Sequence, residues 1–287
     1  MKARAFSYVR ADSLAAARAA FLAASGDASY ISGGQSLVPA LALRLQAPEI
    51  LVDLGHVADM RGVTLEGDML RIGGLTRHAQ MLTEPLIARH APLLAQAAPH
   101  VAHPAIRNRG TLGGSVALAD PASEFPAMML AMNAQMEIFG ASGTRLVPAD
   151  DYFQDLYQTA LEPGDILVAL HVPSVGPRHR WAFDELTRRR GDYAMVGAGI
   201  QGTFEEDGRV GDIRIAFFSV AATPVRVKSV EAALAGQVID APLIAQVQGL
   251  IEAELDPAED EHLPPAMRLH LARVLLGRLL QTVSSPT

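Results

Sequence analysis

Two short glycine-centred stretches decide the fold of this chain, Ile31-Ser32-Gly33-Gly34-Gln35-Ser36 and Thr111-Leu112-Gly113-Gly114-Ser115. Paired glycines reach positive φ at little cost and let the main chain approach a ligand with no Cβ in the way. Each stretch is entered from an apolar run and is followed by a serine and a predicted helix. Because the N-terminal end of a helix attracts anions, the two stretches together predict a divided phosphate cradle.

The segments that follow the glycines repeat one local pattern. Ser36 can cap a helix that has Pro39 in its first turn, and Ser123 and Pro126 repeat this spacing. Neither stretch has the G-x-G-x-x-G or G-x-x-x-x-G-K-[ST] spacing of the Rossmann and P-loop motifs. A third pair, Gly73-Gly74, lacks the cap and the proline. We expect it to form a tight turn, with ligand contact as the alternative.

The composition is that of a globular protein and excludes several functions. The 287 residues are 49% hydrophobic and 19% charged, which supports two domains with a sizeable core. A net charge of −7 and 5% aromatic residues argue against nucleic-acid binding. The chain has no cysteine, which excludes disulfides, thiolate nucleophiles and cysteine-ligated iron–sulfur clusters within it. It has no signal-peptide core and no apolar run near the ~18 residues of a membrane span, so we expect a cytoplasmic protein.

The order of the expected elements predicts an α+β protein of two domains. The first spans residues 1–175, with lobes at about 1–57 and 58–175, and the second spans residues 178–287 after a linker rich in proline. The second domain is predicted to be an antiparallel meander backed by three helices. The remaining expectations are a helix over 14–22, strands over 28–32, 50–54, 70–74 and 166–172, helices from Thr76 and over 85–96, a hairpin over 135–147, and meander strands over 180–187, 193–204 and 213–221.

The polar residues predict a cofactor-binding protein without its own catalytic group. His100 and His103 lie close together, but no carboxylate at helical spacing completes a metal triad, so we expect no metal site. The sequence has no G-x-S-x-G elbow, nucleophile or acid–base pair, which favours a role in which a bound cofactor supplies the chemistry. Glu124 suits either the dipole of the helix that it begins or hydrogen bonds from ribose or adenine. Asp120 has the same second role, or caps the turn at Pro121.

The chain resembles the flavin-binding medium subunit of molybdenum hydroxylases, most closely the type found in carbon monoxide dehydrogenase. The resemblance runs in order over nearly the whole length, and no single motif carries it alone. The residues that carry it are Ser32-Gly33-Gly34-Gln35-Ser36-Leu37, Ile106 to Ser115, Asp120 to Pro126, and Arg190-Gly191-Asp192-Tyr193-Ala194.

The resemblance implies a bipartite FAD-binding domain of the PCMH type, followed by a smaller C-terminal domain of antiparallel sheet and helices. It implies that the FAD diphosphate lies between the two glycine stretches, that Glu124 contacts the ribose and that Tyr193 lies near the isoalloxazine. The complete implied set of FAD-binding residues is Ser32, Gly33, Gly34, Gln35, Ser36, Leu37, Ile106, Thr111, Gly113, Gly114, Ser115, Asp120, Glu124, Leu167, Asp192 and Tyr193.

The implied function is electron transfer. Substrate would be oxidised in a large molybdenum-cofactor subunit, and electrons would pass through the two-iron two-sulfur clusters of a small subunit to FAD in this chain, then to an external acceptor. The implied assembly is a dimer of heterotrimers. The absence of cysteine agrees with clusters housed in another chain. Arg188-Arg189-Arg190 is expected to be a solvated strand edge, or else to dock the small subunit or steer an anionic acceptor.

This sequence departs from the family pattern at two places. Ser115 stands where many relatives have asparagine, and it can still donate one hydrogen bond. Asp184-Glu185 stands where relatives often carry a lysine after the aromatic residue that here is Phe183. A cation near a flavin stabilises its anionic reduced form, so this change puts the oxidant in doubt more than FAD binding.

Two other functions fit the same residues. One is a free-standing FAD-dependent oxidase or dehydrogenase whose C-terminal domain binds substrate directly. The missing catalytic constellation counts against it. The other is a non-catalytic nucleotide-binding module for assembly. Flavin absorbance and co-purifying subunits distinguish the three.

Overall fold

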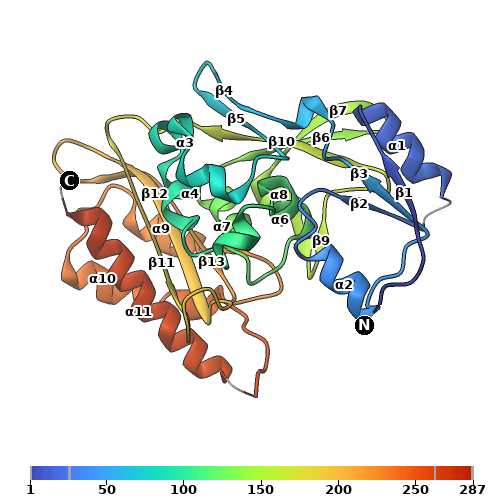
Figure 1. Ribbon diagram of the computed structural model, residues 1–287. Coiled ribbons are helices and arrows are strands. Elements are labelled where there is room, and N and C mark those ends of the chain that lie inside the picture. The colour runs from blue at the N-terminus through green and yellow to red at the C-terminus, as the bar shows by residue number, and fades with distance from the viewer. Residues whose placement is uncertain (1, 25–26, 262, 286–287) are drawn as a thin grey trace.

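The computed structural model describes residues 2–24, 27–261 and 263–285 and contains three main sheets, each carried by a different part of the chain (Figure 1). The predicted α+β class is confirmed. The small N-terminal sheet lies at one side of the molecule, a five-stranded sheet lies in the middle, and the C-terminal sheet with its helices lies at the other side.

The N-terminal sheet is parallel and has the order β1-β3-β2. It consists of β1 (Ser7–Arg10), β2 (Ala28–Ile31) and β3 (Ile50–Asp53), with α1 (Leu14–Ala23) and α2 (Leu37–Leu43) as connections. The predicted helix and both predicted strands are confirmed. Because the strands are parallel, the first glycine stretch leaves β2 at the carboxyl edge of the sheet, where ligands bind in open α/β sheets.

The middle sheet is antiparallel and has the order β4-β5-β10-β6-β7. The hairpin and the strand over 166–172 are confirmed. Strand β4 was not predicted, because its alternation of apolar and polar residues extends over four residues only, most of them exposed. The strands are β4 (Val63–Glu66), β5 (Met69–Gly73), β6 (Gln135–Gly140), β7 (Gly143–Pro148) and β10 (Ile166–Pro173), and β8 (Phe153–Asp155) and β9 (Gln158–Thr159) form a separate hairpin.

Two helix predictions in this lobe are wrong. The helix expected over 85–96 is broken into α3 (Pro85–His90) and α4 (Pro92–Ala97). Pro92 disfavours the helical conformation at the preceding residue, and Ala91 accordingly has φ −137° and ψ 53°. In place of a helix from Thr76, a single 3₁₀ element, η2 (His78–Leu82), follows β5. The other short elements are η1 (Ala58–Met60), α5 (Pro104–Arg107), α6 (Leu112–Leu118), α7 (Glu124–Ala131) and α8 (Ala149–Tyr152).

The C-terminal sheet is the predicted antiparallel meander, in the order β11-β12-β13-β14. The three closing helices are also confirmed, and they cover one face of this sheet (Figure 1). The elements are β11 (His179–Leu186), β12 (Val196–Phe204), β13 (Val210–Phe218), β14 (Val225–Arg226), α9 (Lys228–Leu234), α10 (Ala241–Gln248), η3 (Ile251–Ala253) and α11 (Pro265–Ser284).

The other face of the C-terminal sheet packs on α7, so the two halves of the chain share a core. Side chains alternate along a strand, and Phe218 joins the core around α7 while Phe217 joins the core under α11. Met128 of α7 is fully buried and lies over Gly199 of β12, where an added Cβ would stand 2.5 Å from its methyl carbon. Met129 of the same helix is also buried in this core.

We expect Met128→Ala to destabilise the chain strongly. Truncating a fully buried methionine leaves a cavity between α7 and β12 and costs about 2–5 kcal/mol of unfolding free energy. The midpoint of urea-induced unfolding is measured by circular dichroism. Met267→Ala is the matched control, since Met267 is 50% exposed. Equal midpoints for the two variants would show that α7 does not join the two halves.

Candidate functional site

The first glycine stretch presents a row of unpaired main-chain donors. Among the hydrogen bonds of residues 2–24, 27–261 and 263–285, none uses the N–H group of any residue from 32 to 37 as a donor. Gly34 has φ +71°, and the Gln35 side-chain amide donates to the Gly33 carbonyl at 3.1 Å. Successive free N–H groups in such a turn form an anion-binding concavity. This arrangement fits a diphosphate.

Ser36 does not have its predicted capping role. Ser36 is itself in a right-handed helical conformation, and its side chain makes no cap hydrogen bond to α2. A capping residue normally has extended backbone, which directs its oxygen back toward the first-turn N–H groups. The serine hydroxyl is therefore available to a ligand, together with the main-chain donors beside it.

The second glycine stretch is built differently from its prediction. Gly113 and Gly114 do not form a turn before a helix but lie in the first turn of α6, and neither has positive φ. Thr111 caps α6, and its side chain accepts a hydrogen bond from the Gly114 N–H at 3.1 Å. The N–H groups of Leu112, Gly113 and Ser115 donate to the carbonyls of Thr76, Gly74 and Thr111. The main-chain donors expected here are thus already used within the protein, and the Thr111 N–H and the Ser115 hydroxyl stay available.

The two stretches touch, although they lie 79 positions apart in sequence. The Ser32 and Thr111 hydroxyls form a hydrogen bond of 3.1 Å. An added Cβ on Gly33 would stand 2.5 Å from the Arg109 carbonyl oxygen, and one on Gly114 would stand 2.9 Å from the Ser32 hydroxyl. These glycines are therefore required by the close approach of the two lobes, whereas the sequence suggested space for a ligand.

The third pair, Gly73-Gly74, packs between the second glycine stretch and β10. An added Cβ on Gly113 would stand 2.7 Å from Gly74, and one on Gly74 would stand 2.8 Å from the Leu167 carbonyl oxygen. The backbones of β5, α6 and β10 are consequently stacked directly on one another. Leu167 is buried in this stack. The carbonyl of Ile106 accepts a hydrogen bond from the Gly110 N–H at 2.7 Å, which closes the loop before Thr111.

A second group of predicted residues gathers beyond the end of α6. Asp120 caps the turn at Pro121, because its Oδ1 accepts the Ala122 N–H at 2.9 Å. Its Oδ2 accepts the hydroxyl of Tyr193 at 3.1 Å, which links the end of α6 to the loop between β11 and β12. Desolvation and the charge of Asp120 raise the pKa of Tyr193 to about 12. The Tyr193 side chain is 70% exposed and available for contact.

Glu124 begins α7, as predicted, and it is a poorly solvated carboxyl among other acids. Desolvation, with Glu185 and Asp120 nearby, raises the pKa of Glu124 to about 7. Glu185 is itself buried and pairs with His100 at 3.3 Å, and its other oxygen has no hydrogen-bond partner among the described residues. Glu185 therefore has a histidine beside it in this chain, and its hydrogen bond raises the pKa of His100.

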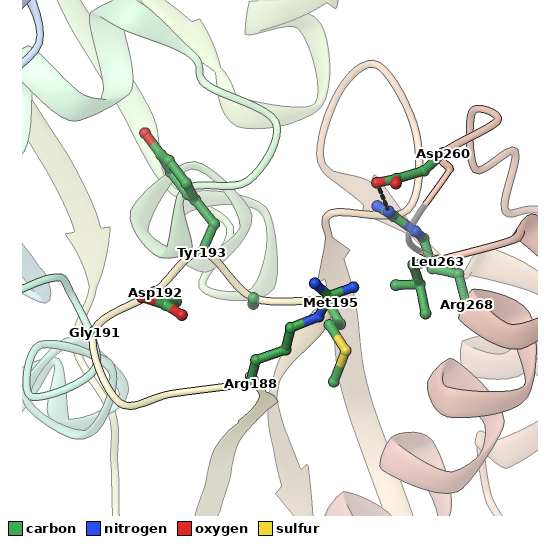
Figure 2. Close-up of a pocket in the computed structure, with 9 residues that line it drawn as sticks. Arg188, Gly191, Asp192, Tyr193, Met195, Asp260, Leu263 and Arg268 are labelled. Atoms are coloured by element: carbon green, nitrogen blue, oxygen red, sulfur yellow. Dashed lines mark hydrogen bonds and ion pairs between the residues drawn. The ribbon is translucent and has the colours of Figure 1, made fainter.

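The loop between β11 and β12 borders an open cavity of about 500 Å³ (Figure 2). Asp192 is exposed on this loop, and Arg268 of α11 faces the cavity from the other side, paired with Asp260 at 3.2 Å. The Arg188-Arg189-Arg190 run is exposed, but it lies in the loop after β11 ends, so the strand-edge prediction is wrong. The run falls after Leu186 because the chain turns away from the sheet before Gly191, which has φ +88°.

Sequence reasoning missed two residues at the contact between the glycine stretches. His78 is buried against Phe125 beside Gly110, and burial lowers its pKa to about 4. Arg77 pairs its backbone with Thr111, and its guanidinium donates to the Arg109 carbonyl. Neither residue belongs to a glycine motif or a basic run. The available sequence signal for both residues was that they follow shortly after the pair Gly73-Gly74. This pair packs against α6 and so brings the residues after β5 close to the second glycine stretch.

The part of the chain that the structure describes contains neither a group of side chains that could hold a metal ion nor a helix that could span a membrane. No three His, Cys, Asp or Glu side chains gather there in a metal-binding group. His103 instead packs against Gly191, and His100 pairs with Glu185. None of the helices in that part has both the length and the apolar character needed to cross a bilayer.

Known protein families match nearly the whole chain. Residues 4–175 match the family described as the FAD binding domain in molybdopterin dehydrogenase, and residues 181–283 match the CO dehydrogenase flavoprotein C-terminal domain. The chain is 35% identical to the alpha subunit of the 6-hydroxypseudooxynicotine dehydrogenase complex of Paenarthrobacter nicotinovorans, covering 98% of this chain and 95% of that protein. It is also 35% identical to the carbon monoxide dehydrogenase medium chain of Afipia carboxidovorans, covering 96% of each.

The same relationship holds for a solved structure. The carbon monoxide dehydrogenase of Hydrogenophaga pseudoflava contains a chain that superposes with a TM-score of 0.96 at 34% identity, covering 99% of this chain and 98% of that one. The match extends over both glycine stretches and the C-terminal sheet. This chain therefore belongs to the family of FAD-binding medium subunits of molybdenum hydroxylases.

Proposed function

We propose that this chain carries FAD as the electron-transfer subunit of a cytoplasmic molybdenum hydroxylase. Electrons would arrive from two-iron two-sulfur clusters in a small subunit, after substrate oxidation in a large molybdenum-cofactor subunit, and leave to an external acceptor. The observation that carries this proposal is the row of free N–H groups at residues 32–37, held against Thr111 of the other lobe. The lack of cysteine supports clusters in another chain, as does full-length similarity to proteins named as subunits of complexes.

The residues of the site divide into two tasks. Residues 32–37, with the Thr111 and Ser115 hydroxyls, would bind the diphosphate, while Glu124 would accept a ribose hydroxyl and Tyr193 would cover part of the ring system. Bound FAD supplies the ability to take up and release electrons in pairs or singly. No side chain of this chain is required to react covalently. We propose that the subunits assemble as a dimer of heterotrimers.

The absorbance spectrum of the purified chain tests the proposal. We expect a flavin spectrum without iron–sulfur absorbance, and recovery of a large and a small subunit when the chain is purified from its native source. A chain that remains colourless after incubation with excess FAD would contradict the cofactor assignment. A flavin-containing chain that purifies alone and oxidises substrate directly would favour the free-standing oxidase.

We expect Gly33→Ala to reduce FAD affinity at least tenfold. The new Cβ would lie 2.5 Å from the Arg109 carbonyl and push the two lobes apart at the cradle. Affinity is measured by quenching of flavin fluorescence on binding to the cofactor-free chain. Gly176→Ala is the control, because its Cβ would meet nothing closer than 3.6 Å. Unchanged FAD affinity in Gly33→Ala would place the diphosphate elsewhere.

We expect Glu124→Gln to stabilise the cofactor-free chain while weakening FAD binding. A carboxyl whose pKa rises from 4.5 to about 7 on folding destabilises the folded state progressively between these pH values, and fully above pH 7. Glutamine mimics the protonated form, so the gain should be about 1–3 kcal/mol at pH 8 and near zero at pH 4.5.

The stability gain is measured by thermal unfolding at the two pH values, and FAD affinity is expected to fall about fivefold with the loss of one charged hydrogen bond. Glu206→Gln, in an exposed turn, is the control and should change neither quantity. A gain of equal size at both pH values would show that it does not arise from the titration of Glu124.

A further inference from the structure

Arg77 connects the two glycine stretches through a single carbonyl group. Its guanidinium donates a hydrogen bond to the Arg109 carbonyl oxygen. That same oxygen lies 2.5 Å from the position of a Cβ on Gly33. The backbone of Arg77 also pairs with Thr111, so the side chain starts beside the second stretch and ends beside the first. The positive charge is therefore held at the contact between the two stretches.

Two other arginines lie near this guanidinium, and Arg61 donates to the Gly55 carbonyl. Arg109 and Arg61 both lower the pKa of Arg77, after desolvation, and Asp53 opposes them. The Asp53 carboxylate is already occupied, because it accepts the Tyr8 hydroxyl and the Gly55 N–H. Within the part of the chain that the structure describes, none of the three arginines has a carboxylate within 4.0 Å.

Such a cluster costs free energy unless an anion neutralises it. Each guanidinium repels the others, and Arg77 is partly withdrawn from the solvent that would screen this repulsion. The free N–H groups of residues 32–37 carry partial positive charge of the same sign and point to the same occupant. A bound diphosphate would relieve the repulsion and satisfy those donors together.

We propose that Arg77, with Arg61 and Arg109 nearby, binds the diphosphate of the dinucleotide together with the N–H groups of residues 32–37. The inference rests on FAD binding at the cradle, and it assigns the charge recognition to the second lobe. Arginine suits this task because its planar donors can engage two phosphate oxygens together. The arginines would thereby favour a dinucleotide over flavins with one phosphate or none.

The test compares three flavins on the cofactor-free full-length chain. Dissociation constants for FAD, FMN and riboflavin are measured by fluorescence quenching at 50 and 300 mM KCl. We expect Arg77→Gln to raise the FAD constant about tenfold at 50 mM, to flatten its salt dependence and to leave riboflavin binding unchanged. Arg109→Gln, whose side chain holds no part of the loop, should have a smaller effect of the same kind.

Two further variants separate charge from structure. Arg77→Lys keeps the charge but lacks the planar pair of donors, so it should recover part of the FAD affinity. Arg278→Gln, exposed on α11, should behave as the unchanged chain. Equal weakening of FAD and riboflavin by Arg77→Gln, or an unchanged salt dependence, would overturn the inference and make Arg77 a structural residue. FAD binding by the unchanged chain supports the proposed function in either case, and its absence would overturn that function.

Discussion

The contact between the two glycine stretches is the constraint on which the rest of the site depends. Ser32 and Thr111 share a hydrogen bond, and Gly33 lies so close to the Arg109 carbonyl that no side chain fits between them. The two sheets also share a buried core, in which Val52 of β3 packs with Ile166 and Val168 of β10, and the contact between the stretches sets their separation at the cradle. The stacking of Gly113 on Gly74 holds the second stretch from behind. Tight backbone packing thus positions donors that belong to two different lobes.

The two lobes present different polar groups at the cradle. The first offers unpaired N–H groups, while the second uses most of its N–H groups internally and offers hydroxyls and guanidinium groups. The α6 helix then leads from Thr111 to Asp120, and Asp120 joins the loop that carries Tyr193. Because α7 packs on the C-terminal sheet, this loop is fixed relative to the cradle. The C-terminal domain thereby holds Tyr193 beside Asp120.

The sequence predicted the regular parts of this arrangement well and the close contacts poorly. The meander, the hairpin and the first glycine turn follow local rules of alternation, turn residues and positive φ, as Gly34 illustrates. The break at Pro92 also has a local cause, but the apolar spacing on both sides of it favoured one helix. The placement of Gly113 within α6, the arrangement of Arg77 and the pairing of Glu185 with His100 depend on contacts between distant segments. No pattern within a window of a few residues encodes such contacts.

Hydrogen–deuterium exchange of the main chain, with and without FAD, tests whether the first glycine stretch binds the cofactor. FAD is expected to protect the N–H groups at residues 32–37 strongly, because nothing else in the described part of the chain satisfies them. Little change is expected at residues 112–115, whose N–H groups are already bonded within the protein. Unchanged exchange at residues 32–37 in a chain saturated with FAD would contradict this assignment.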